Sequence, residues 1–140
     1  MLPALLIVHL LSLAAGAGVS VAGGIVGPYA ATATPEGRRL LWAIQTKLSR
    51  VGSAAIVLLW ITGLWMLFAK FGGFGGLPAT FQVKLAFVVL ITLAIGVLHV
   101  LMARSNRTGV QPSPAVMATL GLAIDVSLIF VVIFAVLTFG

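Results

Sequence analysis

Four long runs of apolar residues, separated by short polar or glycine-rich segments, dominate this chain. The runs cover residues 2–31, 51–69, 81–103 and 115–139. Each approaches or exceeds the roughly 20 residues that a helix needs to cross the apolar core of a bilayer. The pattern therefore predicts an all-α integral membrane protein, in which residues 1–140 form a single bundle of four transmembrane helices.

Signals for helix ends lie between the runs. Thr34, Pro35 and Glu36 are typical of an N-cap, a first-turn proline and a first-turn acid, so the second helix is expected to begin near Pro35 and to enter the membrane at about residue 51. The glycine-rich segment 72–78 is expected to end it. The first run follows no Lys or Arg and is longer than the apolar part of a signal peptide, so we expect it to be a retained span.

Composition excludes several classes of protein. Hydrophobic residues make up 61% of the chain and charged residues 7%, against about 25% charged residues in a soluble domain. A soluble domain of this size could not bury so much apolar surface, which excludes a soluble enzyme. The absence of cysteine excludes disulfides, thiolate metal sites and iron–sulfur clusters.

The net charge of +6 is typical of a nucleic-acid binder, but the distribution of the charges indicates a lipid bilayer as the partner, with no nucleic acid. Most of the basic residues fall in two connections, between the first and second runs and between the third and fourth. Such short basic loops mark the cytoplasmic side. Both termini are then expected on the outer, periplasmic side of a bacterial inner membrane, which the protein crosses several times. The basic residues of the two connections are Arg38, Arg39, Lys47, Arg50, Arg104 and Arg107.

Four ionisable side chains fall within the predicted spans, where they are costly and therefore candidates for function: His9, Lys84, His99 and Asp125. By helical rise, His9 lies about 10 Å and Lys84 about 5 Å from the outer ends of their spans, so the two can share one site. His99 lies about 15 Å from His9 along the membrane normal, so the two histidines cannot ligate the same iron.

A strip of small residues continues the helix face on which His9 lies. Ser12, Gly16, Ser20 and Gly24 recur every four residues, and such a strip allows close approach of a neighbouring helix or of a flat ligand. We therefore consider His9 a candidate ligand of haem iron, with Ser12 and Gly16 beside the cofactor. Helix packing alone, with His9 bonded to a neighbouring helix, is the alternative.

A second polar group is expected in the inner half of the bundle. Asp125 lies near the middle of the fourth run, and His99 and Arg50 approach it from the inner side. We expect these three residues to form an inner polar cluster. A proton-handling site is the alternative interpretation of Asp125.

Several short motifs resemble the small four-helix membrane proteins related to the HemJ-type protoporphyrinogen oxidases and, more distantly, the copper-resistance D-type membrane domains. The resemblance implies a membrane protein associated with haem b, in which His9 and Lys84 are the catalytic residues. The motifs are Val8-His9-Leu10, Gly37-Arg38-Arg39-Leu40-Leu41, Thr62-Gly63-Leu64-Trp65-Met66-Leu67 and Gln82-Val83-Lys84-Leu85.

The chain departs from that family at Gly96-Val97-Leu98-His99, where the family has a Gly-Tyr-His-His group. Two functions therefore stay open. The first is a haem b-associated oxidoreductase acting on a porphyrin or a quinone-like substrate, with His9 as iron ligand or proton carrier and Lys84 binding a carboxylate. The second is a non-enzymatic accessory or assembly subunit, in a homo-oligomer or a larger membrane complex.

Overall fold

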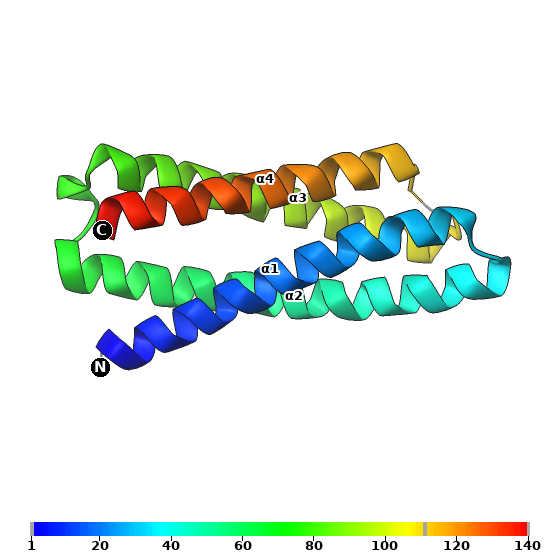
Figure 1. The fold of residues 1–140 in the computed structure, drawn as a ribbon, viewed down its shortest axis with the longest axis horizontal. Coiled ribbons are helices and arrows are strands. Elements are labelled where there is room, and N and C mark those ends of the chain that lie inside the picture. The colour runs from blue at the N-terminus through cyan, green and yellow to red at the C-terminus, as the bar shows by residue number, and fades with distance from the viewer. Residues whose placement is uncertain (1, 111, 140) are drawn as a thin grey trace.

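Each apolar run forms one long helix in the computed structural model, which describes residues 2–110 and 112–139 (Figure 1). A single 3-10 turn, η1, lies between the second and third helices. The predicted all-α architecture is therefore confirmed. The elements are α1 (Leu2–Thr32), α2 (Pro35–Phe71), η1 (Phe74–Gly76), α3 (Ala79–Thr108) and α4 (Pro114–Phe139).

The ends of α2 and α3 follow from local backbone chemistry. The Thr34 hydroxyl oxygen accepts a hydrogen bond of 3.2 Å from the Gly37 N–H, and Pro35 occupies the first turn, so the predicted start of α2 is confirmed. Gly72 ends α2 in the left-handed conformation, with φ of 69°, and its N–H donates to the Phe68 carbonyl. Gly109 ends α3 in the same way, with φ of 72°. Only glycine adopts this conformation without strain.

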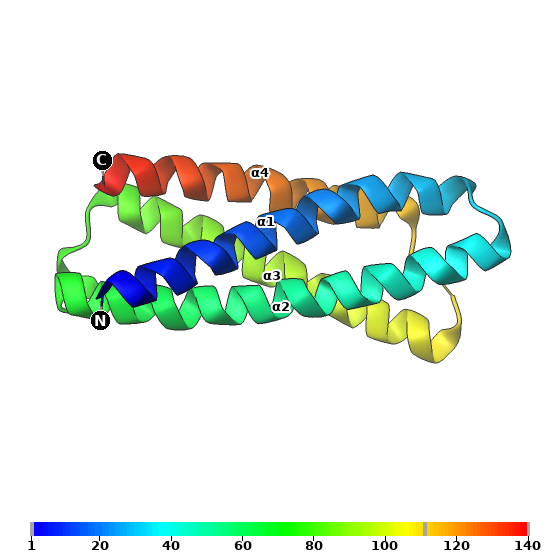
Figure 2. The same ribbon diagram turned by 60° about the horizontal axis from the view of Figure 1, so that its bottom comes forward.

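The four helices pack as two antiparallel hairpins. α1 packs along α2, and α3 packs along α4, whereas α2 and α3 approach each other at only a few positions. α1 crosses α2 obliquely and reaches α4 in its second half (Figure 2). Between α3 and α4, the Phe87 and Phe130 rings stack with centroids 5.0 Å apart, next to a buried cluster of Ile91, Ile124 and Val131.

Large apolar side chains are exposed on every helix of the bundle. In the most apolar stretch of α1 only 6% of the residues are buried, and in those of the other three helices 17%. A surface of this kind is stable in hydrocarbon and not in water. Because each of the four helices is long and apolar enough to span a membrane, the chain is a multi-pass membrane protein.

The two ends of the bundle differ in charge. Both termini lie at one end, together with the connection between α2 and α3 (Figure 1). The other end carries the two remaining connections, and the half of the bundle on that side carries six of the eight basic residues. The two termini therefore lie on the same side of the membrane. Which side this is stays a prediction.

Candidate functional site

His9 of α1 is held against α2 by one hydrogen bond. Its Nδ1 lies 2.8 Å from the Thr62 hydroxyl oxygen, and Thr62 is buried. The Thr62 hydroxyl donates its own proton to the Leu58 carbonyl, at 2.6 Å. Thr62 can therefore only accept from His9, which places the imidazole proton on Nδ1. Nε2 makes no hydrogen bond within the described part of the chain, so its lone pair is available to a ligand.

The His9 ring lies next to the α2 backbone at Gly63. A Cβ atom added to Gly63 would stand 3.5 Å from His9 Cε1, which is van der Waals contact. A larger side chain at this position would meet the ring. Thr62 and Gly63 thus set the orientation of the imidazole together, the first by its hydroxyl and the second by its lack of a side chain.

Lys84 of α3 lies close enough to His9 for its charge to act on the imidazole. Its ammonium nitrogen is 5.4 Å from the centroid of the Phe81 ring, within the range of a cation–π contact, and the lysine side chain is partly buried. The structure therefore brings His9 and Lys84, from two different helices, to the same end of the bundle. Phe81 itself is buried.

Ser12 and Gly16, expected beside a cofactor, both serve contacts within and between helices. The Ser12 side chain is buried, and its hydroxyl donates to the Val8 carbonyl of α1 itself, at 2.8 Å. A Cβ added to Gly16 would stand 3.8 Å from the Ala55 side chain of α2. The space next to Gly16 is thus filled by α2, and these contacts match the helix-packing alternative.

His99 of α3 is hydrogen-bonded to two serines of α2. Its Nε2 lies 2.8 Å from the Ser53 hydroxyl and 3.3 Å from the Ser49 hydroxyl, and its Nδ1 lies 2.9 Å from the Ile95 carbonyl of its own helix. Both ring nitrogens of His99 are therefore engaged, in contrast to His9.

Asp125 has a different partner from the one expected. The Ser20 hydroxyl of α1 donates to the Asp125 carboxylate, which joins α1 to α4. Arg50 is exposed, and no ion pair between it and Asp125 occurs in the described ranges. The inner polar residues thus form two separate bridges, one from Asp125 to α1 and one from His99 to α2. None of these hydrogen bonds joins His99, Asp125 and Arg50 to one another, as the expected cluster would require. The sequence indicates the depth of each residue in the membrane but not the direction that its side chain faces.

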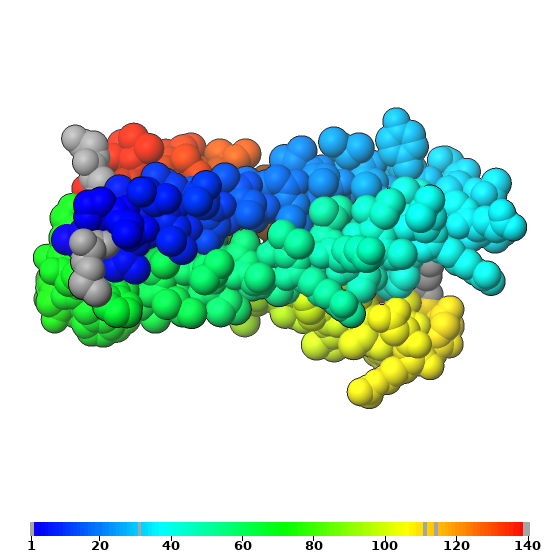
Figure 3. Space-filling model, turned by 90° about the horizontal axis from the view of Figure 1, so that it is seen from below, coloured from blue at the N-terminus to red at the C-terminus, as the bar shows by residue number. Residues whose placement is uncertain are grey.

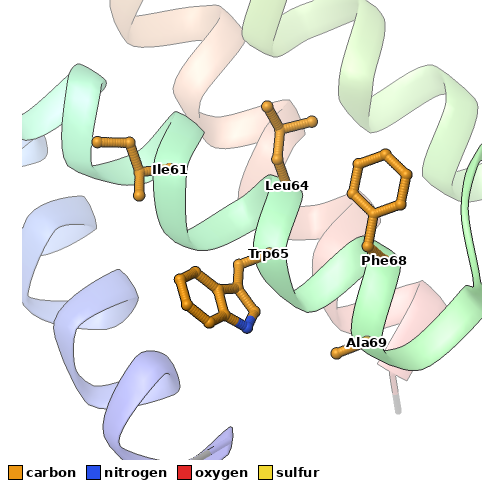
Figure 4. Close-up of a pocket in the computed structure, with 5 residues that line it drawn as sticks. All are labelled: Ile61, Leu64, Trp65, Phe68 and Ala69. Carbon is orange, nitrogen blue, oxygen red and sulfur yellow. The ribbon is translucent and has the colours of Figure 1, made fainter.

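An open apolar groove of about 460 Å³ lies on α2 (Figure 4). In the sequence, its lining residues lie on both sides of Thr62 and Gly63. It is lined by residues of α2 alone, and no polar group enters it apart from the indole of Trp65. A groove with one helical wall is a surface that lipid covers and not an enclosed site. Its lining residues are Ile61, Leu64, Trp65, Phe68 and Ala69.

Metal donors are sparse. Among residues 2–110 and 112–139, no three His, Cys, Asp or Glu side chains come together in a group that could hold a metal ion.

No protein-family model, curated protein or solved structure matches the chain. Any function therefore has to be argued from the residues themselves.

Sequence reasoning named His9 and Lys84 but missed the roles of Thr62, Gly63 and Ser20. The register of α1 against α2, which the structure supplies, identifies the first two. In an antiparallel pair of helices, facing residues stay paired when the same number of residues is counted backward along one helix and forward along the other. Gly16 faces Ala55, and the same count from these two residues leads to His9 and Thr62. The motif that contains Thr62 and Gly63 carries the family resemblance, but the motif alone does not show that Thr62 faces His9. No signal of that kind was available for Ser20, because α1 and α4 are far apart in the chain.

Proposed function

We propose that this chain is a haem b-associated membrane protein of the HemJ-like kind, in which His9 holds the haem iron through Nε2. The observation that carries the proposal is the hydrogen bond from His9 Nδ1 to Thr62. When one ring nitrogen of a histidine binds a metal, the other nitrogen nearly always donates its N–H to a fixed acceptor. This hydrogen bond orients the ring and strengthens it as a ligand. Thr62 supplies such an acceptor, and Nε2 keeps its lone pair.

The donor chemistry of the chain fits haem better than a bare metal ion. A single imidazole is a poor site for a free ion, which needs several protein ligands. Haem brings nitrogen ligands of its own, so a single imidazole such as that of His9 would suffice to hold it. The one imidazole near Lys84 with an unbonded nitrogen is therefore in keeping with haem.

Lys84 is the partner for the acidic part of the cofactor or substrate. An ammonium group within electrostatic range of His9 attracts a carboxylate, such as a haem propionate or the side chain of a porphyrin substrate. The attraction is stronger in an environment of low dielectric constant than in water. His9 would then hold the iron, and Lys84 would position the carboxylate. Bound haem would supply one-electron transfer, as an oxidoreductase acting on a porphyrin or a quinone-like substrate requires.

Haem titration of the purified chain in detergent tests the proposal. We expect a Soret band at one haem per chain, its loss in His9→Ala, and its retention in His99→Ala, because both nitrogens of His99 are engaged with serine hydroxyls and a carbonyl. Lys84→Met should weaken binding less than His9→Ala, since it removes a carboxylate contact and leaves the iron ligand. A chain that takes up no haem, or that loses it equally in both histidine variants, would contradict the proposal.

A non-enzymatic accessory subunit is the second candidate, favoured by the surface of α1. The second half of that helix leaves open space beside Gly24 and Gly27, where a Cβ would meet no atom within 4 Å. Small residues on an open helix face allow another membrane helix to approach closely. Failure to bind haem, together with a stable complex recovered by chemical cross-linking in the membrane, would favour this candidate.

We also propose the orientation and the membrane. Six of the eight basic residues lie in the half of the bundle opposite the termini. Lys and Arg accumulate on the cytoplasmic side of membrane proteins, which supports the proposal that both termini lie outside. His9 and Lys84 would then lie toward the periplasmic side of a bacterial inner membrane.

A further inference from the structure

A second apolar groove, on α3, has a feature that the groove on α2 lacks. Its volume is about 410 Å³, and its floor is Gly96, where an added Cβ would meet no atom within 4 Å. Thr92 is its one polar lining residue, and the Thr92 hydroxyl is already engaged: it donates to the Val88 carbonyl and accepts from the Trp60 indole. The groove therefore offers contacts to an apolar chain and no free polar group. Its lining residues are Thr92, Leu93, Gly96, Val97, Val100 and Leu101.

The groove leads directly to two arginines. Gly96, Val100, Arg104 and Arg107 follow one another at steps of four, four and three residues, which places them on a single face of α3. Arg104 is about 6 Å beyond Val100 along the helix axis. Both arginine side chains are exposed. One continuous strip of α3 thus passes from an apolar groove to a pair of guanidinium groups.

No internal acid neutralises these two guanidinium groups. The chain has only two acidic residues, of which Glu36 lies in the first turn of α2 and Asp125 accepts from Ser20. Neither Arg104 nor Arg107 forms an ion pair within residues 2–110 and 112–139. An anion from outside the chain is therefore the natural counter-charge at this position.

The end of α3 stands clear of the rest of the bundle, where a lipid can reach it. Figure 3 shows the last turns of α3, in yellow, as a lobe that projects beside the start of α2, in cyan. The Trp42 indole of α2 donates a hydrogen bond of 3.2 Å to the Asn106 side chain and so connects the lobe to α2. Tryptophan is typical of the boundary between hydrocarbon and headgroups.

We propose that this strip of α3 binds an anionic phospholipid, with an acyl chain along the groove over Gly96 and the phosphate between Arg104 and Arg107. The groove spans about 13 Å from Thr92 to Leu101, which is long enough for much of an acyl chain. A phospholipid satisfies the apolar groove and the arginines together. A free phosphate would use the arginines alone and leave the groove without an occupant.

The headgroup half of the site is tested by native mass spectrometry of the full chain in detergent, titrated with phosphatidylglycerol or phosphatidylcholine. The variant is Arg104→Gln with Arg107→Gln, and the control is Arg39→Gln with Lys47→Gln, which removes the same charge from α2 in the same half of the bundle. At about 1 kcal/mol for each basic residue near an anionic surface, the variant should bind phosphatidylglycerol about 30-fold more weakly at low salt, and the control much less so. Equal losses in the two would overturn the proposal.

The acyl half is tested by Gly96→Leu, which fills the floor of the groove, against Gly121→Leu, which places the same side chain in open space on α4. Gly96→Leu should weaken phosphatidylglycerol binding about fivefold or more, and Gly121→Leu should leave it unchanged. Soluble glycerophosphate should neither bind nor compete at the same concentrations. Equal behaviour of the two leucine variants, or competition by glycerophosphate, would show that the arginines bind phosphate without the groove.

Discussion

The two intramembrane histidines differ in the hydrogen bonds of their rings. His99 has both nitrogens engaged, Nδ1 at the Ile95 carbonyl and Nε2 at the serine hydroxyls of α2. His9 has only Nδ1 engaged, at Thr62. Since a ligand needs a free lone pair on a ring nitrogen, His9 is the better candidate for chemistry and His99 the better candidate for holding α2 to α3.

Thr62→Val tests the role assigned to the hydroxyl at the residue scale. Valine keeps the shape of threonine but cannot accept from His9 Nδ1, so the free energy of unfolding should fall by about 1 kcal/mol. Haem affinity should fall by about 10- to 100-fold, because the ring loses the acceptor that orients it. Denaturant titration and haem titration measure the two effects.

The matched control is Thr92→Val, which removes the partner of the Trp60 indole at a similar depth on α3. It should cost a similar free energy of unfolding and leave haem affinity unchanged. Equal losses of haem affinity in the two variants would contradict the specific role of Thr62.

The bridge between Ser20 and Asp125 is tested by a double-mutant cycle of Ser20→Ala and Asp125→Ala. Hydrogen bonds between membrane helices contribute about 0.6 to 1.7 kcal/mol, and the coupling free energy should lie in this range. Asp125→Asn keeps an acceptor for the Ser20 hydroxyl and should cost less than Asp125→Ala. Coupling near zero, measured by reversible unfolding in mixed micelles, would exclude this bridge as a stabilising contact.

At the scale of the elements, α2 connects the two hairpins of the bundle. One face of α2 carries Ala55 and Thr62 and meets α1. Another face carries Ser53 and Trp60, whose side chains bond to His99 and Thr92 of α3. Because α2 and α3 approach each other at only a few positions, long polar side chains span the gap between them. A substitution on the second face should therefore loosen the contact between hairpins before it disturbs either hairpin.

The C-terminal end of α2 depends on the left-handed conformation of Gly72. Gly72→Ala should lower the free energy of unfolding by about 1 to 2 kcal/mol, because a Cβ is strained at φ of 69°. Gly75→Ala is the control in the same connection: Gly75 is not among the positive-φ glycines, and a Cβ there would meet no atom within 4 Å. Equal effects of the two substitutions, compared by denaturant titration, would contradict the capping role.

How far the sequence predicts this structure differs between elements and contacts. The start of α2 was predictable from Thr34 and Pro35, since capping depends on neighbouring residues alone. The partners of Asp125 and His99 were not, because an apolar run shows almost no preferred face when lipid covers most of the helix. Depth along the membrane normal could be counted from the sequence, but the rotation of each helix depends on packing between segments far apart in the chain.

At the scale of the whole molecule, the two ends of the bundle differ both in charge and in the candidate site that each carries. His9 and Lys84 lie toward the end that carries the termini, and Arg104 and Arg107 lie at the opposite end. If the basic end faces the cytoplasm, the proposed haem site lies in the outer half of the membrane and the proposed lipid site at the inner leaflet. Anionic lipids of that leaflet would then meet the arginines that have no internal counter-charge.

Cysteine labelling tests this orientation, and the absence of native cysteine removes background from the experiment. Gly75, in the connection between α2 and α3, and Thr108, at the end of α3, are both exposed and lie at opposite ends of the bundle. With Gly75→Cys, a membrane-impermeant maleimide should label intact cells. With Thr108→Cys, labelling should require permeabilised cells, since the basic loops are held in the cytoplasm. Labelling of both positions from the same side would contradict the four-span topology, and the reverse pattern would invert the orientation and move the proposed haem site to the inner half of the membrane.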